Sequence, residues 1–240
     1  ALCRPLVVGD AAVLTAAAAF SGLSPAVHRV AEPAAGRYTP GTLDVLDLAN
    51  MPLARLAHKT VTAEQGKAAY EYIAKAIELA LAGLLDGTVT GPINKASLNA
   101  GGFHFAGHTE IYAHLTGTRD YAMMLVEGGF RVVHVSTHVS LREACDRVKR
   151  DRVLKVIHLT REALARLGIA APRIAVAGLN PHCGEGGLFG DEDEREIAPA
   201  VAAARGLDYV IAVDCTGTMR YHGRAIAAVA AVQKLIGTMA

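Results

Sequence analysis

Residues 173–187 read RIAVAGLNPHCGEGG, and this stretch decides the fold class. Its first part, residues 173–178, is a short and nearly continuous apolar run, which is typical of a strand buried on both faces of a sheet. The run leads directly into a glycine-rich loop, residues 180–190, that carries His182. Buried strands that end in polar, glycine-bearing loops are typical of α/β proteins, in which ligands bind beyond the carboxyl ends of the strands.

Segments of the same kind alternate with helical patterns along the rest of the chain. We expect strands at residues 6–8, 88–90, 123–126, 132–137, 173–178 and 209–213, and an extended segment at residues 27–39. We expect helices at residues 11–20, 62–85, 141–148, 153–167, 192–204 and 224–236. Thr62 followed by Gln65 is a capping-box pattern, and Gly168 stands where a helix C-cap glycine belongs. The alternation predicts an α/β protein with a largely buried sheet.

Composition excludes several classes of protein. Of the 240 residues, 52% are hydrophobic and 20% are charged, which excludes a disordered chain. The 24 Lys and Arg are balanced by 23 Asp and Glu, so the chain lacks the basic character of most nucleic-acid binders. No run reaches the roughly 18 uninterrupted apolar residues that a membrane span needs. We therefore expect neither a nucleic-acid partner nor a membrane partner.

The cysteines and the first residues bear on the compartment. The four cysteines are far apart and form no CxxC pair, which argues against a zinc ribbon or a disulfide framework: Cys3, Cys145, Cys183 and Cys215. Reduced thiols in the cytoplasm are the expectation. The chain begins with Ala and shows no signal-peptide pattern, so we expect its N-terminus to be incomplete.

Two histidines are candidates for a metal site. His138 ends one predicted strand and His182 follows another, so two imidazoles in adjacent strand-end loops could share a divalent ion. The alternative is that both are polar loop residues that bond to the backbone. Spacing alone favours this alternative, because no local ligand motif joins them and no third ligand stands out.

A second candidate is an anion site at residues 107–110, which read GHTE just before a predicted helix. Backbone N–H groups at a helix start, together with His108 and Thr109, suit a phosphate or a carboxylate. Lys95, in the turn GPINK at residues 91–95, would add a positive charge. The alternative is that Thr109 simply caps the helix. The loop after residue 180 is glycine-rich, but it matches neither of the nucleotide-binding patterns GxGxxG and GxxxxGK[ST]. The alternative to a nucleotide site there is a flexible loop.

These motifs occur together and in order: GPINK at residues 91–95, GHTE at 107–110, TH at 137–138 and GLNPHCGEGG at 178–187. The combination resembles the 4-hydroxythreonine-4-phosphate dehydrogenase family of pyridoxine biosynthesis. The resemblance implies a two-lobed α/β/α architecture like that of isocitrate and isopropylmalate dehydrogenases. It also implies a homodimer in which two subunits complete each active site.

The resemblance also implies roles for particular residues. His138 and His182 match two of three histidines that hold a divalent metal, which could be Zn, Mn, Co, Ni or Mg. His108 and Thr109 match contacts to the phosphate end of the substrate, and Asn94 and Lys95 match a catalytic turn that lines the cleft. We expect NAD, or NADP, to contact residues of the glycine-rich loop: Asn180, Gly184, Glu185 and Gly186.

The function implied is NAD- and metal-dependent oxidation, with decarboxylation, of a phosphorylated hydroxy acid. Candidate substrates are 4-hydroxythreonine 4-phosphate and erythronate or threonate 4-phosphate. The alternatives are a degenerate ligand-binding homologue without catalysis and an acyltransferase like the phosphate acetyltransferases. We expect residues 1–240 to form one two-lobed catalytic unit. Compared with the family pattern, we expect this sequence to lack an N-terminal segment and a stretch between Val213 and Asp214. The third metal-binding histidine of the family normally lies in that stretch.

Overall fold

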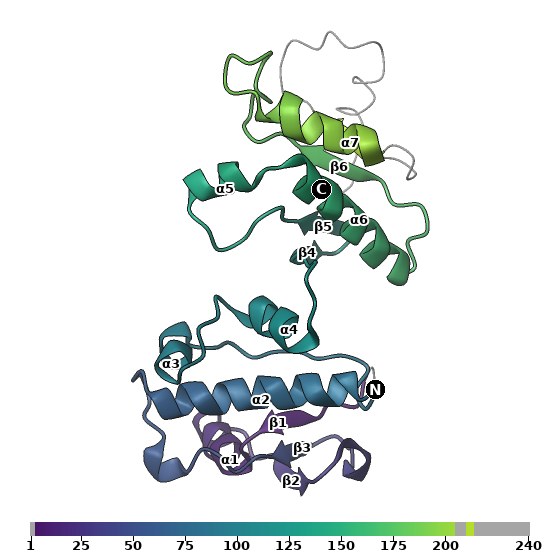
Figure 1. The fold of residues 1–240 in the computed structure, drawn as a ribbon. Coiled ribbons are helices and arrows are strands. Elements are labelled where there is room, and N and C mark those ends of the chain that lie inside the picture. The colour runs from purple at the N-terminus through teal and green to yellow at the C-terminus, as the bar shows by residue number, and fades with distance from the viewer. Residues whose placement is uncertain (1–2, 205–209, 214–240) are drawn as a thin grey trace. The chain divides into compact units, whose positions relative to one another are not determined.

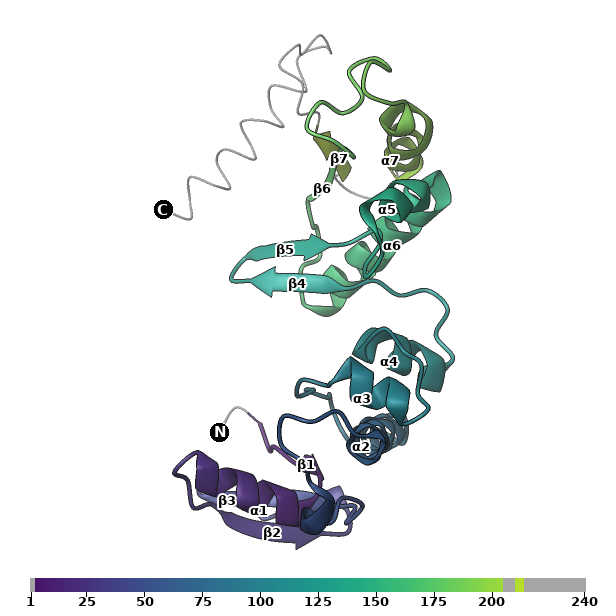
Figure 2. The same ribbon diagram turned by 90° about the vertical axis from the view of Figure 1, so that its left-hand side faces the viewer.

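The computed structural model describes residues 3–204 and 210–213. The chain divides into two compact units, Ala1–Arg119 and Asp120–Ala240, and each is described by itself. Both units combine strands with covering helices (Figures 1 and 2). The predicted α/β class is therefore confirmed.

The first unit contains a parallel sheet of order β1-β3-β2. The strands are β1 (Val7–Gly9), β2 (Ala26–Val30) and β3 (Thr42–Asp47). The strand predicted at residues 6–8 is confirmed. The extended segment predicted at residues 27–39 is β2 followed by the short 3₁₀ turn η1 (Pro33–Ala35). Strand β3, which lies in the centre of the sheet, was not predicted, because its two aspartates interrupt the apolar run.

Three helices of this unit begin at or near their predicted starts, and the fourth, at residues 95–100, was not predicted. They are α1 (Ala11–Phe20), α2 (Ala63–Leu81), α3 (Lys95–Ala100) and α4 (His108–Thr116), with a 3₁₀ turn η2 (Leu53–Arg55) before α2. Thr62 caps α2 by accepting a hydrogen bond from the Gln65 amide at 3.2 Å. The Gln65 side chain accepts bonds from the Thr62 hydroxyl and the Ala57 amide. The predicted helix start is thus confirmed, with Gln65 also holding the preceding loop.

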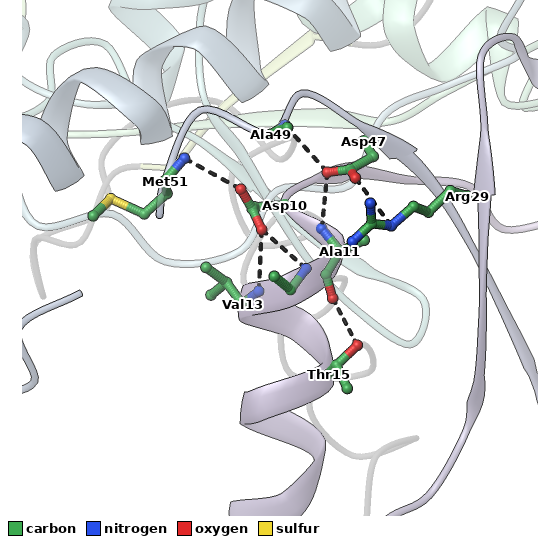
Figure 3. A network of polar contacts seen from close by, with 9 residues as sticks. Asp10, Ala11, Val13, Thr15, Arg29, Asp47, Ala49 and Met51 are labelled. Carbon is green, nitrogen blue, oxygen red and sulfur yellow. Dashed lines mark hydrogen bonds and ion pairs between the residues drawn. The ribbon is translucent and has the colours of Figure 1, made fainter. Parts of the chain in front are cut away.

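Two aspartates at the carboxyl ends of β1 and β3 satisfy the backbone where the strands stop (Figure 3). Asp10 accepts from the first-turn amides of Ala12 and Val13 at 3.0 and 3.1 Å, and from the Met51 amide at 3.2 Å. Asp47 accepts from the amides of Ala11 and Ala49 and pairs with Arg29. Because buried N–H groups need partners, these carboxylates join α1 to the ends of two strands.

The strand predicted at residues 88–90 is not formed. Within the described part of the chain, β1 pairs only with β3, and residues 88–90 join no sheet. Val89 is fully exposed, with a relative exposure of 102%. The prediction is wrong because apolar, β-branched residues make a strand only where a neighbouring strand bonds to their backbone.

The two short helices whose starts carry the GPINK and GHTE motifs pack against α2. Figure 1 shows α2 between the sheet and the two short helices α3 and α4. Its buried side chains Ile73 and Ile77 form one apolar cluster with Leu98 of α3 and Ile111 of α4. Gly66 of α2 faces the backbone carbonyl of Ser97, and a Cβ at residue 66 would overlap it. Glycine is therefore required for α3 to lie this close to α2.

The second unit contains an antiparallel hairpin and a parallel strand pair (Figure 2). Its strands are β4 (Met124–Glu127), β5 (Phe130–Val133), β6 (Ile174–Ala177) and β7 (Val210–Val213). Its helices are α5 (Leu141–Arg147), α6 (Arg150–Arg166), the π-helical turn η3 (Asp193–Ile197) and α7 (Ala198–Ala204). The strand predicted at residues 132–137 lies earlier, in β5. The helix predicted at residues 224–236 lies outside the described residues.

The core of the second unit lies where α6 and α7 pack on β6. Val153 and Ile157 of α6 form one buried cluster with Ile197 and Val201, against which Val176 of β6 packs. Gly168 has a φ of +83° after the end of α6, and the Ile169 amide bonds to the Leu164 carbonyl at 2.9 Å. This Schellman geometry confirms the predicted glycine cap. No helix among the described residues is long and apolar enough to cross a membrane.

Asp44, in the centre of β3, is buried yet fully bonded. Its carboxylate accepts from the amides of Arg37 and Tyr38 at 3.0 and 2.8 Å, and His28 Nδ1 lies 2.7 Å from it. The Arg37 amide first, and then the His28 contact, hold the pKa of Asp44 below its ordinary value of 3.8. These bonds make an aspartate compatible with the middle of a sheet.

The contact between Gly66 and Ser97 gives a stability prediction. In Gly66→Ala, the added methyl group overlaps the Ser97 carbonyl, so α3 must move away from α2. We expect a loss of about 1–3 kcal/mol in the free energy of unfolding, as for overpacked cores, measured by urea denaturation. Gly87→Ala is the matched control, because a Cβ there meets open space. A Gly66→Ala protein as stable as the wild type would contradict the close contact.

The bonds of Asp44 give a pH prediction. A carboxyl whose pKa is lowered by folding stabilises the fold at pH values above its unfolded pKa, and this contribution is lost as pH falls through the folded pKa. We therefore expect Asp44→Asn to be less stable than the wild type at pH 7, with the difference shrinking below the ordinary pKa of 3.8. Urea denaturation at several pH values measures this. A difference that does not depend on pH would contradict the role of the carboxylate charge.

Candidate functional site

Asn94 and Lys95 lie at the start of α3. The Asn94 side chain accepts a hydrogen bond from the Ser97 amide at 2.8 Å, so Asn94 is the N-cap of this helix. Lys95 is the first helical residue and is exposed. The geometry therefore gives Asn94 a structural role, while the ammonium group of Lys95 is free to reach a ligand. The catalytic role expected for both residues stays a prediction.

His108 and Thr109 are the first two residues of α4. Gly107 precedes the helix in an extended conformation, and no side chain caps it. The alternative that Thr109 caps the helix is wrong, since Thr109 lies inside the first turn. Amide groups at such a start have no partner within the helix and point outward along its axis. The helix dipole adds partial positive charge at the same place, which suits an anion.

Two side chains of this motif carry a buried polar atom that has no hydrogen-bond partner among the described residues. These atoms are Nε2 of His108 and Oε2 of Glu110. Burial lowers the pKa of His108 below its ordinary value of 6.5, so the imidazole is uncharged at pH 7. An uncharged ring with an unpartnered nitrogen can donate or accept one hydrogen bond, according to its tautomer.

His108 lines a cleft of about 1400 Å³ in the first unit. Its other walls come from β1, from α2 and from residues 83–93, with Tyr112 of α4 beside His108. Asn94, Lys95 and Thr109 are not among its lining residues. Tyr72 of α2 also lines it, and burial first, then the charges of Asp10, Asp47 and Glu71, raise the pKa of Tyr72 to about 12. Its phenol therefore stays protonated at neutral pH and remains a hydrogen-bond donor.

His138 and His182 both belong to loops of the second unit that follow strands. His138 lies between β5 and α5, is exposed and has a φ of +58°. His182 follows β6 and is also exposed, with Nδ1 at 3.5 Å from Glu185 Oε2 and its ring centroid 4.8 Å from that of Phe189. Both imidazoles are thus accessible to a ligand. Their joint binding of a metal stays a prediction.

The glycine-rich loop is a compact turn closed by its own hydrogen bonds. The Asn180 side chain accepts from the His182 amide at 2.9 Å and donates to the Phe189 carbonyl at 3.1 Å. Every residue from Cys183 to Gly187 has a positive φ, including Cys183 and Glu185, which rarely adopt it. Gly184 is required here because a Cβ would come within 2.6 Å of the Gly190 carbonyl. The glycines therefore shape the loop that presents His182.

The donor set fits part of a metal site. Imidazoles suit Zn, Mn, Co or Ni, and His138 and His182 supply two of them. Within residues 3–204 and 210–213, no group of three or more His, Cys, Asp or Glu could hold a metal ion. A complete site would need a further donor, and the binding of a metal by His138 and His182 stays a prediction.

Two residues of the cleft were missed by reasoning from the sequence. The Tyr112 hydroxyl donates a hydrogen bond to Thr88 Oγ1 at 2.7 Å, and both residues line the cleft beside His108. Helical spacing could have placed Tyr112 on the same face of α4 as His108, since it follows four residues later. No signal in the sequence links it to Thr88.

The comparisons with known proteins agree with this description. Residues 1–219 match the family model of the pyridoxal phosphate biosynthetic protein PdxA. A relative from Symbiobacterium thermophilum, named as a D-threonate 4-phosphate dehydrogenase, is 48% identical over 209 residues, covering 87% of this chain and 62% of the relative. A relative from Desulfosudis oleivorans, named 4-hydroxythreonine-4-phosphate dehydrogenase, is 47% identical over 204 residues, covering 85% and 60%.

Among solved structures, a 4-hydroxythreonine-4-phosphate dehydrogenase from Klebsiella pneumoniae is similar with a TM-score of 0.78 and 41% identity. The match covers 85% of this chain and 62% of that chain. Matches of this kind confirm the isocitrate and isopropylmalate dehydrogenase-like fold class and the resemblance drawn from the four motifs. The chain spans less than two thirds of the length of these relatives, and it belongs to the PdxA family.

Proposed function

We propose that this chain carries out the NAD-dependent and divalent-metal-dependent oxidation of a phosphorylated hydroxy acid, with decarboxylation. In this reaction the secondary alcohol loses a hydride to the nicotinamide and a proton, and the resulting 3-keto acid loses CO2. The substrate would be 4-hydroxythreonine 4-phosphate, or erythronate or threonate 4-phosphate. The names of the relatives as dehydrogenases of such acids support this proposal.

The observation that carries the proposal is the start of α4 in the cleft of the first unit. His108 lines that cleft with an unpartnered, buried Nε2, and the uncapped first turn of α4 supplies amide donors. A phosphate group bound there would accept bonds from these amides and from the His108 ring. Thr109 lies in the same turn but does not line the cleft, so it would contribute its backbone amide.

The second unit would supply the metal and cofactor contacts. His138 and His182 would hold a divalent ion together with a donor from outside the described residues. Such an ion, when bound, lowers the pKa of a coordinated hydroxyl and polarises the oxygen of a carbonyl. Gly184, Glu185 and Gly186 would approach NAD, or NADP, with their backbone. Because the Asn180 side chain closes the loop, we expect its contribution to be mostly the shape of this site.

The proposal extends to assembly and compartment. We propose a cytoplasmic homodimer in which two subunits complete each active site, as the family resemblance implies.

A second candidate function is ligand binding without catalysis. The observation that favours it is the absence of a third metal donor among the described residues. Such a protein would bind a phosphorylated acid through the start of α4 and would not reduce the nicotinamide. The assay below separates the two functions.

We expect the protein to reduce NAD when it is given a divalent ion and D-threonate 4-phosphate or 4-hydroxythreonine 4-phosphate. His108→Ala should raise KM for the phosphorylated acid by about tenfold, because it removes a hydrogen bond to a charged group worth roughly 1.5–3 kcal/mol. Nicotinamide absorbance measures the rate. His104→Gln, an exposed histidine bonded to Asn99, is the matched control. Binding of the acid without any nicotinamide reduction would favour the second candidate.

Metal binding can be tested without the reaction. We expect His138→Gln and His182→Gln each to lower the affinity for Mn²⁺ or Zn²⁺ by at least about tenfold, since even outer partners of metal ligands contribute this much. Isothermal titration calorimetry measures the affinity, with His104→Gln as the control. If the doubly substituted protein bound the ions as tightly as the wild type, these two histidines would not be ligands.

A further inference from the structure

Residues 86–93, which join α2 to α3, are held by very few polar contacts. Among the residues that the structure describes, the one hydrogen bond made to them runs from the Tyr112 hydroxyl to Thr88 Oγ1, at 2.7 Å. No sheet ladder in the described part of the chain supports the segment. Its position over the cleft therefore depends strongly on this bond.

Apolar packing fixes the two ends of the segment but not its middle. Leu85, just before it, packs on the cluster of Val30, Leu46 and Leu79. Ile93, at its end, packs on the cluster of α2, α3 and α4, as does Tyr112. Val89, between these anchors, is fully exposed. Thr88 and its bond to Tyr112 are thus the anchor of the middle part.

Tyr112 and His108 stand one turn apart on α4, and both line the same cleft as Thr88 and Thr90. The bond from Tyr112 therefore connects the segment to the very helix whose start carries His108 and Thr109. Any displacement of Thr88 changes the distance across the cleft at this end.

The direction of the bond leaves one proton of Thr88 available. A phenol is a stronger acid than an aliphatic alcohol, so Tyr112 donates and Thr88 accepts. No described group accepts a hydrogen bond from the Thr88 hydroxyl. Because hydrogen bonds in a chain polarise one another, a hydroxyl that accepts from a phenol becomes a better donor. This donor lies on the wall of the cleft.

We propose that the Thr88 hydroxyl, oriented by Tyr112, donates a hydrogen bond to the phosphate group of the substrate. Thr88 is then a specificity-determining contact, and Tyr112 is a positioning residue that acts through it. This inference rests on the proposed function, because it concerns the same phosphorylated ligand.

The test compares four variants with a matched control. Tyr112→Phe and Thr88→Val each remove one partner, the double substitution removes both, and Thr88→Ser restores the hydroxyl. Tyr70→Phe is the control, since Tyr70 packs in the same cluster as Tyr112 and its hydroxyl makes no hydrogen bond among the described residues. Calorimetry gives Kd for D-threonate 4-phosphate and for unphosphorylated threonate. Limited proteolysis within residues 86–93 reports the mobility of the segment.

We expect Tyr112→Phe and Thr88→Val each to weaken binding of D-threonate 4-phosphate about fivefold, as the loss of one hydrogen bond does. The double variant should lose no more than the larger single loss, because the two residues act through one contact. Thr88→Ser and Tyr70→Phe should bind like the wild type. Binding of unphosphorylated threonate should not change, and cleavage within residues 86–93 should be faster in Tyr112→Phe.

Four results would overturn the inference. Additive losses would mean that Tyr112 and Thr88 act separately. Equal losses for the phosphorylated and the unphosphorylated acid would mean a merely structural role. Wild-type affinity in both single variants would mean that neither residue matters, while the proposed function would stand. If the wild type itself did not bind the phosphorylated acid, the proposed phosphate site and this inference would both fail.

Discussion

The close approach of α3 to α2 at Gly66 is the constraint on which the candidate site of the first unit depends. Without a side chain at Gly66, the Ser97 carbonyl lies against the backbone of α2. Leu98 can then enter the cluster of Ile73, Ile77 and Ile111. This packing fixes the starts of both short helices, and these starts carry the GPINK and GHTE motifs. The short distance between the backbones of α2 and α3 therefore determines where the starts of α3 and α4 lie, and so where an anion would bind.

Signals that act within one helix or strand were read correctly from the sequence. Thr62 starts α2 and Gly168 ends α6, because each makes bonds to atoms only a few residues away. Signals that depend on distant partners were not. Strand β3 was not predicted because an aspartate such as Asp44 is unfavourable in a buried sheet. Only the folded chain supplies its partners, which are the His28 side chain and two backbone amides. The strand expected at residues 88–90 is not formed for the opposite reason. Its residues favour a strand, but no neighbouring strand in the described part of the chain pairs with it.

The same distinction holds for the candidate site. His108 was predicted as an anion contact because helix starts have a recognisable sequence. The structure places it on the cleft with a buried, unpartnered Nε2, and its contact with an anion stays a prediction. Asn94 caps the first turn of α3, a role that its position before a short helix also predicts, and the catalytic role expected for it stays a prediction. The bond between Tyr112 and Thr88 joins residues 24 positions apart, and only the packing of α4 brings them together.

The charges around the cleft indicate how an anion would be recognised there. Burial keeps His108 uncharged at pH 7, and Lys95 is exposed and does not line the cleft. A full positive charge on an exposed side chain is largely screened by salt beyond about 10 Å. The cleft itself is lined by two charged side chains, Arg4 and Asp86. Recognition would therefore combine the Arg4 guanidinium with uncharged donors, namely helix amides, a ring nitrogen and hydroxyls. Such donors act through direction and distance, so the rigidity of α4 and of the segment opposite it determines which anions bind.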